Sequence, residues 1–149
     1  MSAELFADTN ILVYAFDRGE PAKQVITQEL LRREGTTGNI AVSTQVLQEF
    51  YVAVTRKLTA TLSVTQAYKA VCCFAEYPLV QVDVALILRA IRRNETERIS
   101  LWDALIIEAA LKAGCKTLLS EDMQAGRGVD GLQIQNPFVN MDTSRPNAV

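Results

Sequence analysis

Short apolar runs alternate along this chain with longer stretches in which apolar residues recur every three or four positions. The short runs are typical of buried strands, and the longer stretches of helices with one apolar face. We predict strands at residues 5–7, 40–42, 79–82, 116–119 and 132–134. We predict a helix just beyond Asp8 and further helices over 22–34, 45–58, 63–76, 84–94 and 101–112. The pattern predicts an α/β layered fold, with a mostly parallel central sheet of four to five short strands flanked by helices.

Composition narrows the possible chemistry. The 149 residues suit a single domain, and the polar residues 142–149 are expected to form a frayed tail. The chain contains no histidine, which excludes Ser-His-Asp and Cys-His catalysis and the usual catalytic zinc sites. Its three cysteines form no C-x-x-C pair, and we find no signal peptide or membrane-spanning run. We therefore expect a cytoplasmic protein with reduced thiols and no membrane partner.

Three acids are predicted to lie near one edge of the sheet. Asp8 follows the first strand, Asp122 follows the fourth, and Asp103 lies in the first turn of the apolar helix before the fourth strand. The carboxyl ends of parallel strands share an edge, and sites in open α/β sheets form outside that edge. Asp103 joins the other two acids only if its helix begins near the same edge.

Each acid alone has a simpler interpretation, because an Asp at such a position often caps a helix or a turn. The small polar residues beside the strand-end acids favour a functional role. Thr9 and Asn10 follow Asp8, and Ser120 lies close before Asp122. Side chains of this kind can hold metal-binding carboxylates in place, which is the role we expect for them.

Converging carboxylates require a proton or a cation. Two carboxylates about 4 Å apart repel by roughly 4 kcal/mol at an effective dielectric constant of about 20. Oxygen ligands without histidine or cysteine suit Mg²⁺ or Mn²⁺. Ions held in this way typically act on phosphates, where they activate water and offset charge on the leaving oxygen.

Glu49 is a fourth candidate. Its helix directly follows the second strand, so the first turns of that helix are expected near the same edge. On a helical wheel Glu49 lies at the margin of the apolar stripe. Periodicity alone therefore predicts a solvated glutamate.

Acidic motifs follow one another in a set order over about residues 5–138. They are Asp8-Thr9-Asn10, Gln48-Glu49-Phe50, Trp102-Asp103-Ala104 and Ser120-Glu121-Asp122, followed by Asn136-Pro137-Phe138. This order resembles the PIN domain and is most similar to the VapC-type toxins of bacterial toxin–antitoxin pairs. The resemblance implies one PIN-like nuclease domain over residues 1–141 and a metal-dependent endoribonuclease activity. It also implies an acidic set of Asp8, Glu49, Asp103 and Asp122, with Glu121 a weaker substitute for Asp122, and a homodimer inhibited by a small antitoxin.

We therefore hypothesise hydrolysis of RNA phosphodiester bonds that depends on Mg²⁺ or Mn²⁺. The acidic set would bind the metal directly or through water, and a metal-bound water would attack phosphorus without a protein nucleophile. One alternative is a Mg²⁺-dependent aspartyl-phosphate phosphatase, although Asn10 replaces the second acid of the Asp-x-Asp pattern of that class. The other alternative is a non-catalytic module that binds RNA or an antitoxin.

RNA binding would depend on local basic groups, because the net charge of the chain is −2. Residues 126–131 match G-x-G-x-x-G but lead into a strand, so we predict a flexible loop there, with Arg127 as a candidate phosphate contact. Trp102 is expected in the core rather than as a base-stacking platform. A solvated helix face is the simpler interpretation of the densest basic run, and contact with RNA or with an antitoxin is the competing one. That run consists of Arg89, Arg92, Arg93 and Arg98.

Overall fold

The computed structural model describes residues 3–124 and 126–139, so the tail predicted over 142–149 lies outside the described residues. Its strands are β1 (Leu5–Ala7), β2 (Ile40–Ser43), β3 (Leu79–Val80), β4 (Thr117–Leu119), β5 (Gly128–Val129) and β6 (Leu132–Gln135). They form one sheet in the order β3-β2-β1-β4-β6-β5. All neighbouring strands are parallel except β5 and β6. The predicted α/β fold with a mostly parallel sheet is confirmed.

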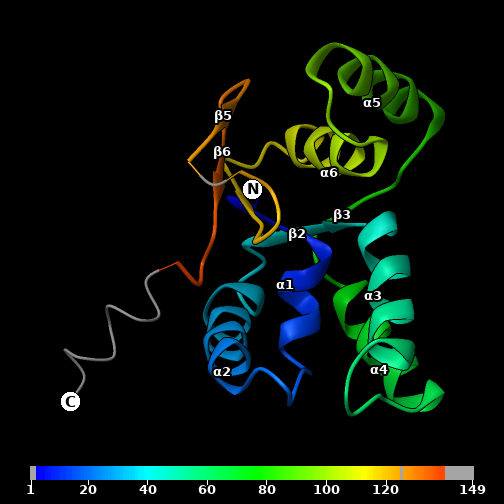
Figure 1. The fold of residues 1–149 in the computed structure, drawn as a ribbon, viewed down its shortest axis with the longest axis vertical. Helices are drawn as coiled ribbons and strands as arrows, with labels where there is room; N and C mark the ends of the chain where they lie inside the picture. The colour runs from blue at the N-terminus through cyan, green and yellow to red at the C-terminus, as the bar shows by residue number, and fades with distance from the viewer. Residues whose placement is uncertain (1–2, 125, 140–149) are drawn as a thin grey trace.

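Helices cover the sheet in two groups. They are α1 (Thr9–Tyr14), α2 (Pro21–Leu30), α3 (Thr44–Arg56), α4 (Val64–Phe74), α5 (Val84–Glu97) and α6 (Leu101–Lys112), and a π-helical turn, η1 (Leu31–Gly35), continues α2. Figure 1 shows α5 and α6 on one side of the strands and α1 to α4 on the other. None of the helices in the described ranges is long and apolar enough to cross a membrane.

The strand count differs from the prediction, because the described chain has six strands instead of four to five. The additional strand, β5, lies where we expected a flexible loop. It pairs with β6 through a tight turn at Asp130 and Gly131, whose φ angles are 51° and 89°. Asp-Gly with positive φ at both positions is the preferred pair for a two-residue hairpin turn. Val129 and Leu132 on either side of the turn are buried, so packing also stabilises this hairpin.

The core fixes the elements that carry the acidic motifs. Phe6 of β1 and Leu118 of β4 are fully buried and lie opposite each other in the parallel ladder. On the side of α1 to α4, the ring of Phe50 packs edge-on against Phe16 at 5.6 Å and Phe74 at 5.2 Å between ring centroids. Edge-to-face pairs of this kind add to the free energy gained by burial. Since Phe50 follows Glu49 in α3, this cluster fixes the position of the helix that presents Glu49.

The hairpin turn gives a first prediction. Gly131→Ala should lower the free energy of unfolding by about 1–2 kcal/mol, because an L-residue with a side chain is strained at a φ of 89°. Urea denaturation measures the loss. Gly128→Ala is the matched control in the same hairpin, because a Cβ there meets only the Gln133 side chain, at an ordinary 3.8 Å. Equal stability of the two variants would contradict the role assigned to the turn.

Candidate acidic site

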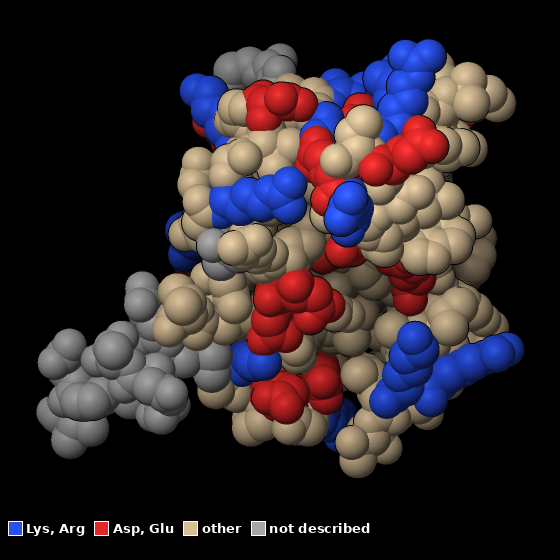
Figure 2. Space-filling model, turned by 45° about the horizontal axis from the view of Figure 1, so that its top comes forward, with Lys and Arg blue, Asp and Glu red and all other residues tan. Residues whose placement is uncertain are grey.

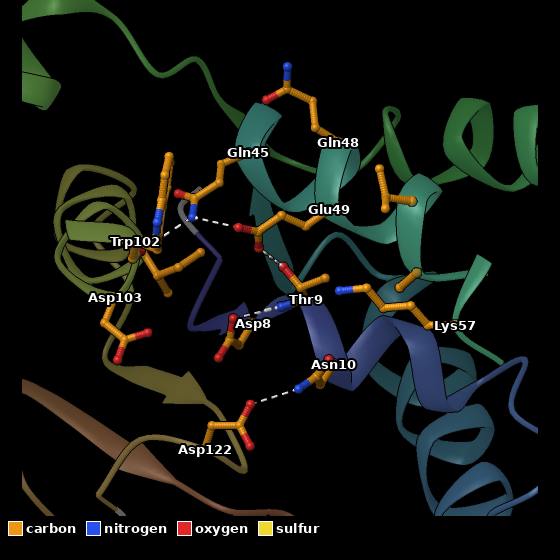
Figure 3. A pocket seen from close by; sticks show the side chains of 13 residues that line it. Asp8, Thr9, Asn10, Gln45, Gln48, Glu49, Lys57, Trp102, Asp103 and Asp122 are labelled. Atoms are coloured by element: carbon orange, nitrogen blue, oxygen red, sulfur yellow. Dashed lines mark hydrogen bonds between the residues drawn. The ribbon is translucent and has the colours of Figure 1, made fainter. Parts of the chain in front are cut away.

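A pocket of about 440 Å³ lies beyond the carboxyl ends of β1, β2 and β4 (Figure 3). Four acids from separate segments line it: Asp8 after β1, Glu49 in α3, Asp103 in the first turn of α6, and Asp122 after β4. Asp103 therefore reaches the same pocket as the strand-end acids, because α6 begins at this edge of the sheet. Figure 2 shows a surface face on which acidic side chains gather around a hollow.

Asp8 is both a helix cap and a pocket residue. One of its carboxylate oxygens accepts a hydrogen bond from the backbone N–H of Thr9 at 2.7 Å, which caps α1. The other oxygen accepts a hydrogen bond from the Ser120 hydroxyl at 2.9 Å. Burial raises the pKa of Asp8 from 3.8 to about 6; the two hydrogen bonds lower it, and repulsion from Asp103 and Glu49 adds to the rise. The fold thus holds Asp8 where ionisation is costly unless positive charge is close.

Glu49 is held from two directions (Figure 3). The Thr9 hydroxyl donates to one of its oxygens at 2.6 Å. The side-chain amide of Gln45, one turn earlier in α3, donates to the other at 3.1 Å and to the backbone carbonyl of Trp102 at 3.3 Å. Both acceptors require the nitrogen of the Gln45 amide, which fixes the orientation of the group and leaves its buried oxygen without a partner among the described residues. Gln45 therefore joins α3 to the start of α6.

Asp122 and Asp103 complete the pocket. The Asn10 amide donates to Asp122 at 2.7 Å, so each of the polar residues Thr9, Asn10 and Ser120 donates to a different acid. The pKa of Asp103 is raised by burial and then by repulsion from Asp122, opposed by Ser100, with a smaller repulsion from Glu49. These shared effects show that the carboxylates are close enough to affect one another.

Glu121 lies outside the pocket. Its carboxylate accepts hydrogen bonds from the Tyr14 hydroxyl and the Lys23 ammonium, and Lys23 also lies 4.9 Å from the centre of the Tyr14 ring. Burial would raise the pKa of Glu121, but these hydrogen bonds outweigh it and hold the pKa below its ordinary value. Of the two adjacent acids, the structure turns Asp122 toward the pocket and ties Glu121 to α2.

Comparison with models of known protein families shows which family the chain belongs to. The family model described as PIN domain matches residues 5–127. The chain belongs to the PIN domain family. No curated protein matches the sequence closely enough to add to this assignment.

Solved structures share the fold of this PIN domain. Mycobacterium tuberculosis VapC20, a Sarcin-Ricin loop cleaving toxin, superposes with a TM-score of 0.61 at 19% identity, covering 79% of this chain and 89% of that one. A toxin–antitoxin complex from Klebsiella pneumoniae gives 0.65 at 17% identity, covering 89% and 97%. VapBC2 from Rickettsia felis, bound to a DNA fragment from its promoter, gives 0.58 at 23% identity with the same coverage.

The basic run of α5 is largely engaged in ion pairs. Arg93 has only 11% of its side chain exposed and pairs with Glu108 of α6 at 2.6 Å. Arg89 pairs with the same carboxylate at 3.3 Å, while Arg92 and Arg98 are exposed. Through Glu108, two of the four arginines connect α5 to α6. The other two lie on a solvated face.

Arg127, the candidate phosphate contact, does not line the pocket. Its guanidinium pairs with Glu97 of α5 at 3.0 Å and so fastens the start of the β5–β6 hairpin to that helix. A contact between Arg127 and substrate stays a prediction.

Trp102 is not a core residue, and here the expectation from sequence was wrong. Its side chain is 62% exposed and lines the pocket beside Asp103. Burial in α6 begins only with Ala104, so the first turn projects beyond the sheet. Sequence reasoning also missed Gln45 and Lys57, which both line the pocket. The position of Gln45, four residues before Glu49 on one helix face, is the signal that would have indicated it.

The donor set of the pocket fits a hard divalent cation, because it consists of carboxylate oxygens. Within residues 3–124 and 126–139, however, no three Asp, Glu or Cys side chains stand in ready metal-binding geometry. Hydrogen bonds are part of the reason that the carboxylates do not converge on one point. Glu49 is bound by Thr9 and Gln45, and Asp122 is bound by Asn10. Shared coordination would require these carboxylates to turn toward one another.

The raised pKa of Asp8 predicts a pH dependence of stability. Between the ordinary value of 3.8 and the folded value of about 6, the native state binds more protons than the unfolded state. In buffer without divalent ions, the free energy of unfolding should therefore fall by about 2–3 kcal/mol as pH rises through this window. Asp8→Asn should remove that loss, as measured by urea denaturation at a series of pH values.

The Ser120→Ala variant should shift this pH dependence instead of removing it. It removes a hydrogen bond that lowers the pKa of Asp8, so the decline in stability should extend to higher pH. If Asp8→Asn and the wild type gave the same pH profile, the buried carboxylate would not be the group responsible.

Proposed function

We propose that this PIN domain is an endoribonuclease dependent on Mg²⁺ or Mn²⁺, and that it is the toxin of a toxin–antitoxin pair. The observation that carries the proposal is the convergence of four carboxylates, from four segments of the chain, on one pocket. The fold it shares with VapC20, a toxin that cleaves the Sarcin-Ricin loop, supports RNA as the substrate.

The acids and their polar neighbours have separate roles in this proposal. Asp8, Glu49, Asp103 and Asp122 would hold the cation directly or through water. Ser120, Thr9 and Asn10 keep three of these carboxylates in place by the hydrogen bonds described above. A bound divalent ion supplies activation of water and offsets charge on the phosphate. Hydrolysis adds the oxygen of water to phosphorus and breaks one bridging P–O bond, so no covalent intermediate with the protein is needed.

A small antitoxin and a second copy of the chain are the proposed protein partners. The complexes from Klebsiella pneumoniae and Rickettsia felis, which share this fold, support the antitoxin. Exposed apolar side chains also support protein contacts, since Val84, Leu88 and Ile91 lie along one face of α5.

The structure adds nothing to the phosphatase alternative. Asn10, which stands where an Asp-x-Asp enzyme has its second acid, donates its amide to Asp122. This contact supports a role for Asn10 in positioning a carboxylate.

The neighbouring acids Asp122 and Glu121 allow a test of the site with a matched control. Asp8→Asn and Asp122→Asn should each lower kcat/KM for RNA cleavage with Mg²⁺ or Mn²⁺ by at least about 100-fold, roughly 3 kcal/mol of transition-state stabilisation. Glu121→Gln is the matched control, because this neighbour of Asp122 points to Lys23 and Tyr14. Cleavage of a labelled RNA in the presence and absence of EDTA measures the effects. Loss of activity in Glu121→Gln alone, or activity in EDTA, would refute the assignment.

Gln45 gives an independent test through metal affinity. Gln45→Leu keeps the volume of the side chain but removes both amide donors, so Glu49 should lose part of its alignment. Mn²⁺ affinity, measured by calorimetry, should fall about 10–100-fold, as is usual when a group that orients a metal ligand is removed. Gln48→Leu is the control, because Gln48 lines the same pocket from the same helix and makes no side-chain hydrogen bond within the described residues. Equal Mn²⁺ affinity in both variants would show that Gln45 does not position Glu49.

A further inference from the structure

The acidic pocket has an exposed aromatic residue at one side. Trp102 is 62% exposed, although indole is among the side chains that gain most from burial. It lies directly before Asp103, and its backbone is held by the Gln45 amide. The ring is therefore presented by a fixed backbone beside the carboxylates (Figure 3). An aromatic surface in such a place is available to stack with a planar group of a ligand.

A cationic side chain lies at the other side of the same pocket. Lys57, the C-cap residue of α3, is the only Lys or Arg among the described residues that line the pocket. It takes part in none of the ion pairs formed between described residues. Figure 3 shows its side chain extending toward Thr9, with Asp8 and Glu49 between Lys57 and Trp102.

Several basic groups elsewhere in the described chain are engaged by acids. Arg93 and Arg89 pair with Glu108, Arg127 with Glu97, and Lys23 with Glu121, and none of these four lines the pocket. On the face drawn in Figure 2, acidic side chains gather in the middle, and basic side chains lie in separate groups around them. The carboxylates repel an approaching phosphate, and the ammonium of Lys57 adds a side-chain attraction to that of the proposed divalent cation.

We propose that Trp102 and Lys57 bind the two chemical parts of a single-stranded RNA across the carboxylates. A nucleobase stacks on the indole of Trp102, and a backbone phosphate contacts the ammonium of Lys57. Single strands are favoured because their bases can be unstacked and placed against an aromatic side chain, whereas a duplex keeps its bases within the helix. This inference rests on the proposed ribonuclease function and deepens it by naming two residues that contact the RNA.

The chain itself provides the optical probe, because Trp102 is its single tryptophan. The Asp8→Asn variant of the 149-residue chain is titrated with a short single-stranded RNA of mixed sequence and, separately, with the blunt duplex of the same length. Stacking predicts that the single strand quenches the emission of Trp102 and that the duplex leaves it nearly unchanged. Unchanged emission at saturating single-stranded RNA would overturn the inference.

Variants separate the two contacts. In the Asp8→Asn background, Trp102→Ala should weaken binding of labelled single-stranded RNA by about tenfold or more, measured by anisotropy, whereas Trp102→Phe should retain most of the affinity. Lys57→Ala should also weaken binding and should reduce the slope of log K against log salt by about 0.7, the value for one phosphate contact on a single strand. Tyr68→Ala and Lys69→Ala are matched controls, since both are exposed residues of α4 that do not line the pocket. Unchanged RNA affinity in Trp102→Ala or Lys57→Ala would contradict the proposed contacts.

Two further measurements keep the outcomes distinct. If Trp102→Ala left RNA affinity unchanged but reduced self-association in sedimentation, the indole would be a contact between copies and the inference would be wrong. Cleavage of the same single strand by the wild type tests the proposed function separately. If the wild type cleaved the single strand and the variants bound it with unaltered affinity, only the inference would be refuted. Absence of cleavage, with the predicted losses of binding, would refute the nuclease assignment and leave the binding contacts supported.

Discussion

The site depends on one contact, between the carboxylate that ends β1 and the hydroxyl that follows β4. Asp8 and Ser120 lie at the ends of neighbouring parallel strands, and the backbone N–H of Asp8 continues the ladder by donating to Leu119 at 3.0 Å. The backbone therefore brings the two side chains together, and the hydrogen bond between them offsets part of the cost of burying Asp8. The remaining cost appears as the raised pKa of Asp8. A cation bound beside a buried carboxylate of this kind would lower the free energy of its ionised form.

Two of the other acids, Glu49 and Asp122, are held near Asp8 by side chains of the α1 helix. Thr9 and Asn10 follow Asp8 in sequence, yet Thr9 donates to Glu49 in α3 and Asn10 to Asp122 after β4. Three consecutive residues thus reach two other segments of the chain, since Asp8 and Asn10 contact the stretch after β4 and Thr9 contacts α3. This explains why a short motif at the start of a chain can organise a site: one helical turn points its polar side chains in different directions, and the neighbouring elements bring an acid to each.

Periodicity predicted the strands and helices well, because burial on one or both faces leaves a direct mark on sequence. It also predicted which residues end the strands, and so which acids lie at one edge. It failed where partners come from distant parts of the chain. Periodicity left Glu49 solvated because the Thr9 hydroxyl that donates to it comes from another segment, and because a helical wheel places Gln45 beside Glu49 without showing that both line a pocket. The β5 strand was missed although Asp130-Gly131 carries a known hairpin signal, because a strand of two residues, one of them glycine, leaves no apolar run in the sequence.

Trp102 and Arg93 are two residues whose burial was predicted wrongly from the sequence. An apolar residue was assigned to the core and is exposed, because α6 extends past the sheet at its first turn. Charged residues were assigned to the surface, and Arg93 is nearly buried against Glu108. Removing one partner from such a buried pair is destabilising, because the other charge is left uncompensated. Arg93 therefore stabilises the packing of α5 against α6, and a basic run in a sequence does not by itself mark a phosphate-binding surface. The cation that faces the carboxylates comes instead from the end of α3, where one lysine, Lys57, remains outside the network of ion pairs within the described chain.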